Sequence, residues 1–151
     1  MKMFKLVSAG LMLGFGLSGI AFAETVTLKF HSFAPAPASQ NSKFVQPWAD
    51  RIEEQSGGEL KVETYYAMQL GGKPPQLVDQ VRDGVVDIIW TVAGYTPGRF
   101  PKIEVFDLPF LPGSAEATSQ AAQDFAQTIA AKELKDFKIL TVHVHAPGKI
   151  H

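Results

Sequence analysis

The side chains best suited to bind a small ligand lie in two places. One group lies at the end of an apolar stretch, and the other lies near the C-terminal end of the chain. Trp90, Thr91 and Tyr95 end the apolar stretch, and His143 and His145 lie two residues apart. Aromatic walls with a few hydrogen-bonding groups are the usual composition of a small-molecule site. These five groups, together with Arg99, predict binding of a ligand.

Arg99 adds a positive charge to this set. It lies in the loop YTPGRFP, residues 95–101, in which two prolines stiffen the backbone. A guanidinium held in this way can bind a carboxylate through two parallel hydrogen bonds. The alternative is an ion pair with a nearby acid such as Glu104 or Asp107.

The histidines also permit a zinc site, which would make the chain a zinc-binding protein. His143 and His145 point the same way in an extended segment, and His31 or His151 would supply a third imidazole. Three or four converging ligands are needed, and the spacing provides only two. We expect no cofactor, and zinc stays the alternative.

Catalytic motifs are missing from the sequence. It contains no G-x-S-x-G, no H-E-x-x-H and no phosphate-binding loop. With no cysteine, neither disulfides nor thiol catalysis are available. The sequence therefore predicts a protein that is not an enzyme, with a small secreted hydrolase as the rival that substrate screening would expose.

Alternating strands and helices must position these residues. Apolar periodicity predicts strands at 25–33, 60–66, 85–92 and 137–145 and a short extended piece at 103–108. Helices are expected between Asn41 or Ser42 and Gly57, at 77–83, and from Ser114 onward, the last with a buried stripe of Ala121, Ala122, Phe125 and Ile129. This order predicts an α/β fold with a mostly parallel central sheet flanked by helices. Ligands bind such sheets at the carboxyl ends of the strands.

The N-terminal residues 1–23 form a separate unit. Lys2 and Lys5 precede an apolar run that ends in the small residues of Ala21-Phe22-Ala23, which predicts an export signal cleaved after Ala23. The run is shorter than the roughly 20 apolar residues of a membrane span, so we expect no stable membrane insertion. Without the signal the chain carries 12 basic and 15 acidic residues. This mild acidity gives no reason to expect a nucleic-acid partner, and the export signal predicts a periplasmic location.

Several segments resemble the solute-binding proteins of tripartite ATP-independent periplasmic (TRAP) transporters, of the DctP type. The resemblance covers residues 26–151 and rests on LKFHSFAPA, on QSGGELKVETY with the following QLGG, and on VRDGVVDI. The stretches EVFDLPFLPGSAEAT and HVHAPG continue it.

The resemblance implies a periplasmic protein of two lobes that close over a small organic acid and deliver it to membrane-embedded transporter subunits. Members of the family are longer, and an arginine of their second lobe, after a D-x-K-G-x-K-x-R-like segment, pairs with the ligand carboxylate. No such segment occurs here. We therefore expect residues 24–151 to be a first lobe with the second lobe missing, an incomplete fragment that binds weakly by itself.

Overall fold

A computed structural model describes residues 24–108, 111 and 113–145. The predicted export signal, its cleavage site and His151 lie outside the described residues. Within them, no helix is both long and apolar enough to cross a bilayer.

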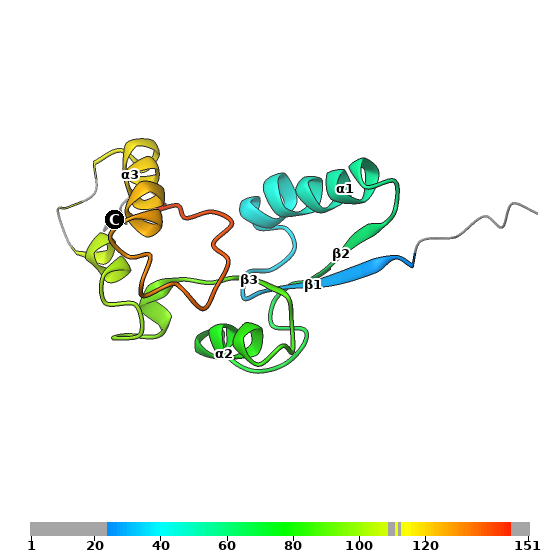
Figure 1. Ribbon diagram of the computed structural model, residues 1–151, viewed down its shortest axis with the longest axis horizontal. Coiled ribbons are helices and arrows are strands. Elements are labelled where there is room, and N and C mark those ends of the chain that lie inside the picture. The colour runs from blue at the N-terminus through cyan, green and yellow to red at the C-terminus, as the bar shows by residue number, and fades with distance from the viewer. Residues whose placement is uncertain (1–23, 109–110, 112, 146–151) are drawn as a thin grey trace, which may run out of the picture.

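Three parallel strands form the sheet at the centre of the fold (Figure 1). They are β1 (Val26–Ser32), β2 (Leu60–Tyr65) and β3 (Ile88–Trp90), in the order β2-β1-β3. β1 pairs with β2 from Val26↔Leu60 to His31↔Tyr65 and with β3 from Phe30↔Ile88 to Ser32↔Trp90. The predicted α/β class with a parallel sheet is confirmed.

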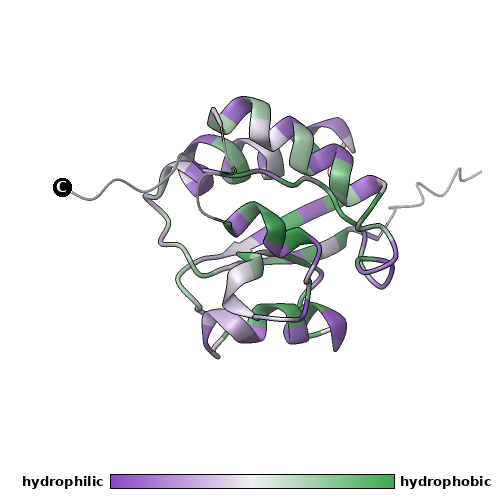
Figure 2. Ribbon diagram, turned by 90° about the vertical axis from the view of Figure 1, so that its left-hand side faces the viewer, coloured by the Kyte–Doolittle hydropathy of each residue, from purple (hydrophilic) through white to green (hydrophobic). Residues whose placement is uncertain are grey.

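One helix covers each face of the sheet. Helix α1 (Gln46–Gln55) lies over one face and α2 (Leu77–Arg82) over the other, with their apolar sides turned inward (Figures 1 and 2). Successive side chains of β3 point to opposite faces of the sheet. Ile88 packs on the cluster around Phe30 on the α1 side, and Ile89 packs on the cluster that contains Val78 of α2. Both side chains are thus packed, although β3 lies at one edge of the sheet.

The entry to α1 differs from the expected cap. A π-helical turn, Asn41–Val45, precedes α1, and neither Asn41 nor Ser42 caps the helix. Instead the Asn41 amide is wholly buried and donates to the carbonyls of Ala34 and Pro35. Pro47 falls in the first turn of α1, where its missing N–H costs nothing.

The remaining helical elements lie before α2 and after β3. They are the 3₁₀ turns η2 (Pro74–Gln76, before α2), η3 (Ala93–Tyr95) and η4 (Ile103–Asp107), and helix α3 (Ala115–Gln127). Ser114 caps α3 by accepting from Ala117 N, which confirms the predicted start. The expected stripe is wrong at two positions, since Ala121 is exposed and Ile129 is 58% exposed. The helix ends at Gln127, so the helical spacing no longer applies, and Ala130 is buried instead.

The piece at 103–108 is a 3₁₀ helix, and the prediction of an extended segment is wrong. Its first backbone donors, Lys102 N and Ile103 N, are bound by the Glu133 carboxylate. That acid, distant in the sequence, satisfies donors that a helix start leaves free.

The segment 137–145 is not a strand, and the third predicted strand is shorter than expected. Val142 N donates to Gln123 Oε1 and Val144 N to Ser119 Oγ, so side chains of α3 replace a neighbouring strand. At β3, the Asp87 carboxylate accepts from Lys29 N at 2.8 Å, and Asp87 N donates to Lys29 O. A side chain therefore takes the place of one ladder bond before Ile88.

Candidate functional site at the carboxyl ends of the strands

The chain leaves all three strands on the same edge of the sheet. We call this edge the carboxyl rim, formed by 33–34 after β1, 66–68 after β2 and 91–95 after β3. Ala67 N donates to Ala34 O and Met68 N to Ser32 O, which ties two of the loops together. Ala67 and Met68 have φ of 48° and 58°, a left-handed conformation that non-glycine residues rarely adopt.

The wholly buried His31 supports the carboxyl rim through its hydrogen bonds. Gln80 Nε2 donates to Gly71 O, so its Oε1 faces His31 Nδ1 at 2.7 Å. Nδ1 must then carry the proton, which leaves Nε2 to accept from Leu70 N at 3.4 Å. His31 thus connects β1, the turn after β2 and α2.

Two aromatic rings meet on the rim. Phe33 and Tyr95 contact edge to face, with ring centroids 5.2 Å apart. Tyr95 is 37% exposed and Phe33 is half-buried. Four residues before Tyr95, Thr91 Oγ1 is buried and has no hydrogen-bond partner among the described residues. The rim therefore offers exposed aromatic surface, and Thr91 adds a polar atom that is shielded from solvent.

Trp90 and His143 come together on the α1 side of the sheet. Their rings lie 4.8 Å apart, and Phe44 contacts Trp90 from the other side at 5.9 Å. With Gln40 and Thr141, these rings line a hollow of about 260 Å³. Since Trp90 also packs on the cluster around Phe30, much of its indole belongs to the core.

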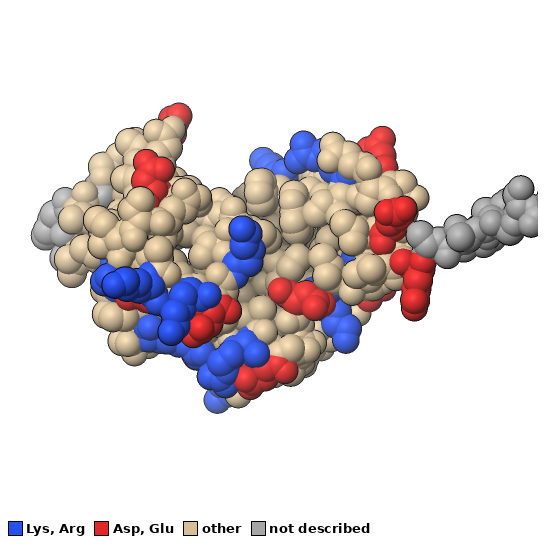
Figure 3. Space-filling model, viewed as in Figure 1, with Lys and Arg blue, Asp and Glu red and all other residues tan. Residues whose placement is uncertain are grey.

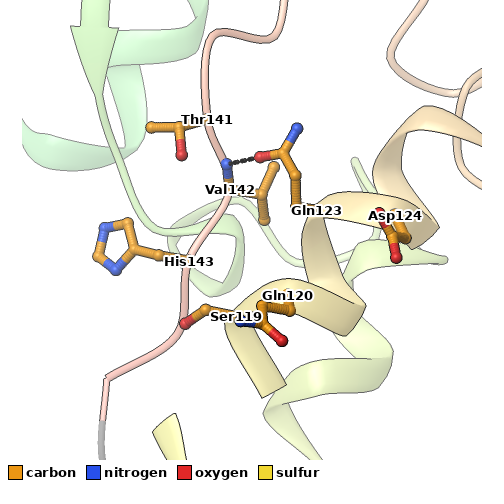
Figure 4. Close-up of a pocket in the computed structure, with 7 residues that line it drawn as sticks. All are labelled: Ser119, Gln120, Gln123, Asp124, Thr141, Val142 and His143. Carbon is orange, nitrogen blue, oxygen red and sulfur yellow. Dashed lines mark hydrogen bonds between the residues drawn. The ribbon is translucent and has the colours of Figure 1, made fainter. Parts of the chain in front are cut away.

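A second hollow, of about 500 Å³, adjoins the first through Thr141 and His143. Its other wall is α3, and Figure 4 shows Val142 turned toward that helix while the His143 ring points away from it. In Figure 3 a notch separates the part of this face formed by α3 from the part formed by α1.

Partial burial lowers the pKa of His143 below its ordinary 6.5. A backbone hydrogen bond with Val144 opposes this shift, and the charge of His145 adds to it. The imidazole is therefore neutral at pH 7 and offers a ligand one donor and one acceptor.

Arg99 is held in an ion pair, although with a residue other than the two acids considered above. Its Nη1 lies 2.7 Å from Asp79 Oδ1 on α2, and Asp79 also contacts Arg82 at 3.0 Å. Glu104 instead accepts from Gly98 N in the same loop. Contact between Arg99 and a ligand stays a prediction. It requires the guanidinium either to leave Asp79 or to bind Asp79 and the ligand together.

The histidines do not gather with other metal-binding residues. Among the described residues, no three or more His, Asp or Glu side chains are grouped to hold a metal ion. His31, offered as a third zinc ligand, has both ring nitrogens engaged by Gln80 and Leu70.

Of the six predicted residues, the structure places Thr91 and Tyr95 on the rim, Trp90 and His143 together on the α1 side, and Arg99 beside α2. Reasoning from sequence did not select Phe33 as a contact. The same strand-end rule that selected Tyr95 would have found it, because Phe33 directly follows β1.

Comparison with known proteins agrees with this architecture. The profile of the DctP family, bacterial extracellular solute-binding protein family 7, matches residues 30–148. The chain belongs to this family. The predicted resemblance to TRAP solute-binding proteins is therefore confirmed.

Two solved structures illustrate the likeness. A TRAP solute-binding protein from a marine metagenome, specific for aromatic acid ligands and bound to 3-hydroxybenzoate, is 68% identical with a TM-score of 0.79. A TRAP solute-binding protein from Rhodoferax ferrireducens, with copurified benzoate, is 53% identical with a TM-score of 0.77. Each match covers 82% of this chain but only 39% and 38% of the other chain.

A curated relative, a solute-binding protein of Verminephrobacter eiseniae, is 29% identical over 91 residues. This match covers 60% of the present chain and 27% of the relative. The chain therefore spans about two fifths or less of the length of these DctP-family proteins.

Proposed function

We propose that this chain contributes one wall of a periplasmic TRAP-type site that captures an aromatic carboxylate. The chain performs no catalysis, and the captured acid passes to membrane-embedded transporter subunits. The observation that carries the proposal is the 68% identity to a protein specific for aromatic acids, at a TM-score of 0.79. The rim adds a chemical reason, since its exposed phenol and half-buried phenyl ring suit a flat apolar ligand.

The ligand sits at the carboxyl rim. Ligands of open α/β sheets bind outside the carboxyl ends of the strands, and here that edge carries Thr91 and Tyr95 from the predicted set. The Tyr95 hydroxyl can exchange hydrogen bonds with polar groups of the acid, whereas Thr91 Oγ1 is buried and reaches them only after local movement. Contacts from Trp90, Arg99, His143 and His145 stay predictions.

A titration monitored by NMR tests the proposal. Benzoate and 3-hydroxybenzoate are added to the ¹⁵N-labelled chain, with acetate and succinate as aliphatic controls. A single open wall covers less of a ligand than the 70–90% buried in a closed pocket, so we expect dissociation constants of the order of millimolar. Amide shifts should cluster at 33–34, 66–68 and 91–95 for the aromatic acids alone.

Two results would contradict the proposal. Equal shifts from acetate and benzoate would show a general anion effect. Aromatic acids that perturb only α3 would place the ligand elsewhere. Variants Trp90→Phe and His143→Ala in the same titration test two of the remaining predicted contacts.

A further inference from the structure

The Phe33–Tyr95 ring pair lies on the carboxyl rim, where two neighbouring strands end. Phe33 leaves β1 and Tyr95 ends η3 after β3, so the pair joins two neighbouring strands at the rim. The 5.2 Å separation and 78° angle leave the face of one ring against the edge of the other. Such a pair stacks a third ring in the same edge-to-face manner.

The two rings are held by different means. The loop of Phe33 is fixed by Ala67 N bonded to Ala34 O and by Asn41 Nδ2 bonded to the same carbonyl. The turn of Tyr95 is closed by Tyr95 N bonded to Val92 O. The surface is therefore arranged before a ligand arrives, which lowers the entropy lost on binding.

Space at η3 is restricted where η4 approaches it. A Cβ added at Gly94, the residue before Tyr95, would lie 3.1 Å from Asp107 Oδ2. A ligand carboxylate placed beside the Asp107 carboxylate would meet a like charge, which is unfavourable. The acid group of a ligand is therefore disfavoured at η4.

We infer that Phe33, with Tyr95, is the determinant that makes this site prefer an aryl acid over a saturated acid of the same size. The inference rests on the function proposed above and names the residues that carry its specificity. A saturated ring presents no π face or polarised edge, so it gains contact area from Phe33 but no ring–ring attraction.

The experiment compares benzoate with cyclohexanecarboxylate, which has the same carboxylate on a ring of similar size. Dissociation constants are measured by ¹⁵N NMR titration for the chain and for Phe33→Leu, Tyr95→Leu and Phe44→Leu. Phe44 is a matched control, since it is 49% exposed and also makes an edge-to-face contact, but with Trp90 on the α1 side.

We expect the unaltered chain to prefer benzoate by about threefold to tenfold, the range of a single aromatic pair. Phe33→Leu and Tyr95→Leu should remove most of this preference, chiefly by weakening benzoate, while Phe44→Leu keeps it. The unchanged spectrum of each free variant establishes that it is folded.

Three outcomes overturn the inference. If the preference for benzoate survives Phe33→Leu, selection for the aryl ring lies elsewhere on the site. The proposed function then still stands. A preference lost in Phe44→Leu but not in Phe33→Leu moves the ring into the α1-side hollow. The absence of any aryl preference in the unaltered chain removes the inference, while rim shifts from benzoate that acetate does not produce leave the proposed function standing.

Discussion

The buried contact between His31 and Gln80 provides the sharpest test of how the rim is supported. We replace Gln80 by methionine, which keeps the length of the side chain but removes its amide. The His31 Nδ1–H, 0% exposed and 2.7 Å from Gln80 Oε1, then has no acceptor. An unsatisfied buried donor costs about 1–3 kcal/mol, so we expect the free energy of unfolding to fall by about 2 kcal/mol.

Urea denaturation followed by circular dichroism measures this loss. Gln127→Met is the matched control, because Gln127 is exposed at the end of α3, and it should change stability by no more than about 0.5 kcal/mol. The double variant His31→Phe, Gln80→Met no longer contains the Nδ1 donor that Gln80→Met leaves unpaired, although Leu70 N then loses its acceptor. It should therefore be more stable than the sum of the single losses predicts, by about 1 kcal/mol.

Hydrogen exchange links the contact to the rim. Leu70 N donates to His31 Nε2, so its amide should exchange faster in Gln80→Met, while amides in the middle of α3 exchange as before. Additive single effects, or a loss no greater than that of the control, would refute the assigned hydrogen bonds.

Three further predictions concern local features. Because the pKa of His143 is lowered in the folded chain, the unfolded chain binds a proton more readily. The free energy of unfolding should therefore fall as the pH drops below about 6.5. In urea titrations, His143→Asn should flatten that part of the pH profile. Ala67→Gly should raise stability by about 0.5 kcal/mol, because φ is 48° at Ala67 and glycine adopts this conformation more easily. Ala117→Gly, at an exposed position of α3, should instead lower stability by about 1 kcal/mol. Equal losses of both variants in thermal melts would argue against backbone strain at Ala67. Ser114→Ala removes the cap bonded to Ala117 N and should cost about 1 kcal/mol, an expectation that an unchanged melting temperature would contradict.

Local signals were enough to predict the first half of the fold. Alternating apolar residues placed β1 and β2 within two residues at either end. Gly57, with φ of 63°, ends α1 because glycine adopts that conformation without a steric cost. Ser114 was recognisable as a cap for the same kind of local reason.

The second half depended on partners distant in the sequence. The 3₁₀ helix at 103–107 requires the Glu133 carboxylate, and the extended segment near Val142 requires Gln123 and Ser119 of α3. In the sequence, an apolar run whose backbone is hydrogen-bonded by side chains looks the same as a strand whose backbone is hydrogen-bonded by a neighbouring strand.

The site divides in the same way. Residue type and strand-end position were sufficient to select Thr91 and Tyr95, and the motifs were sufficient to place the chain in the DctP family. Only the tertiary structure paired Tyr95 with Phe33, Trp90 with His143, and Arg99 with Asp79. The sequence records which groups a chain carries along its length, but the contacts among them depend on how the strands and helices pack, and that is decided by atoms far apart in the chain.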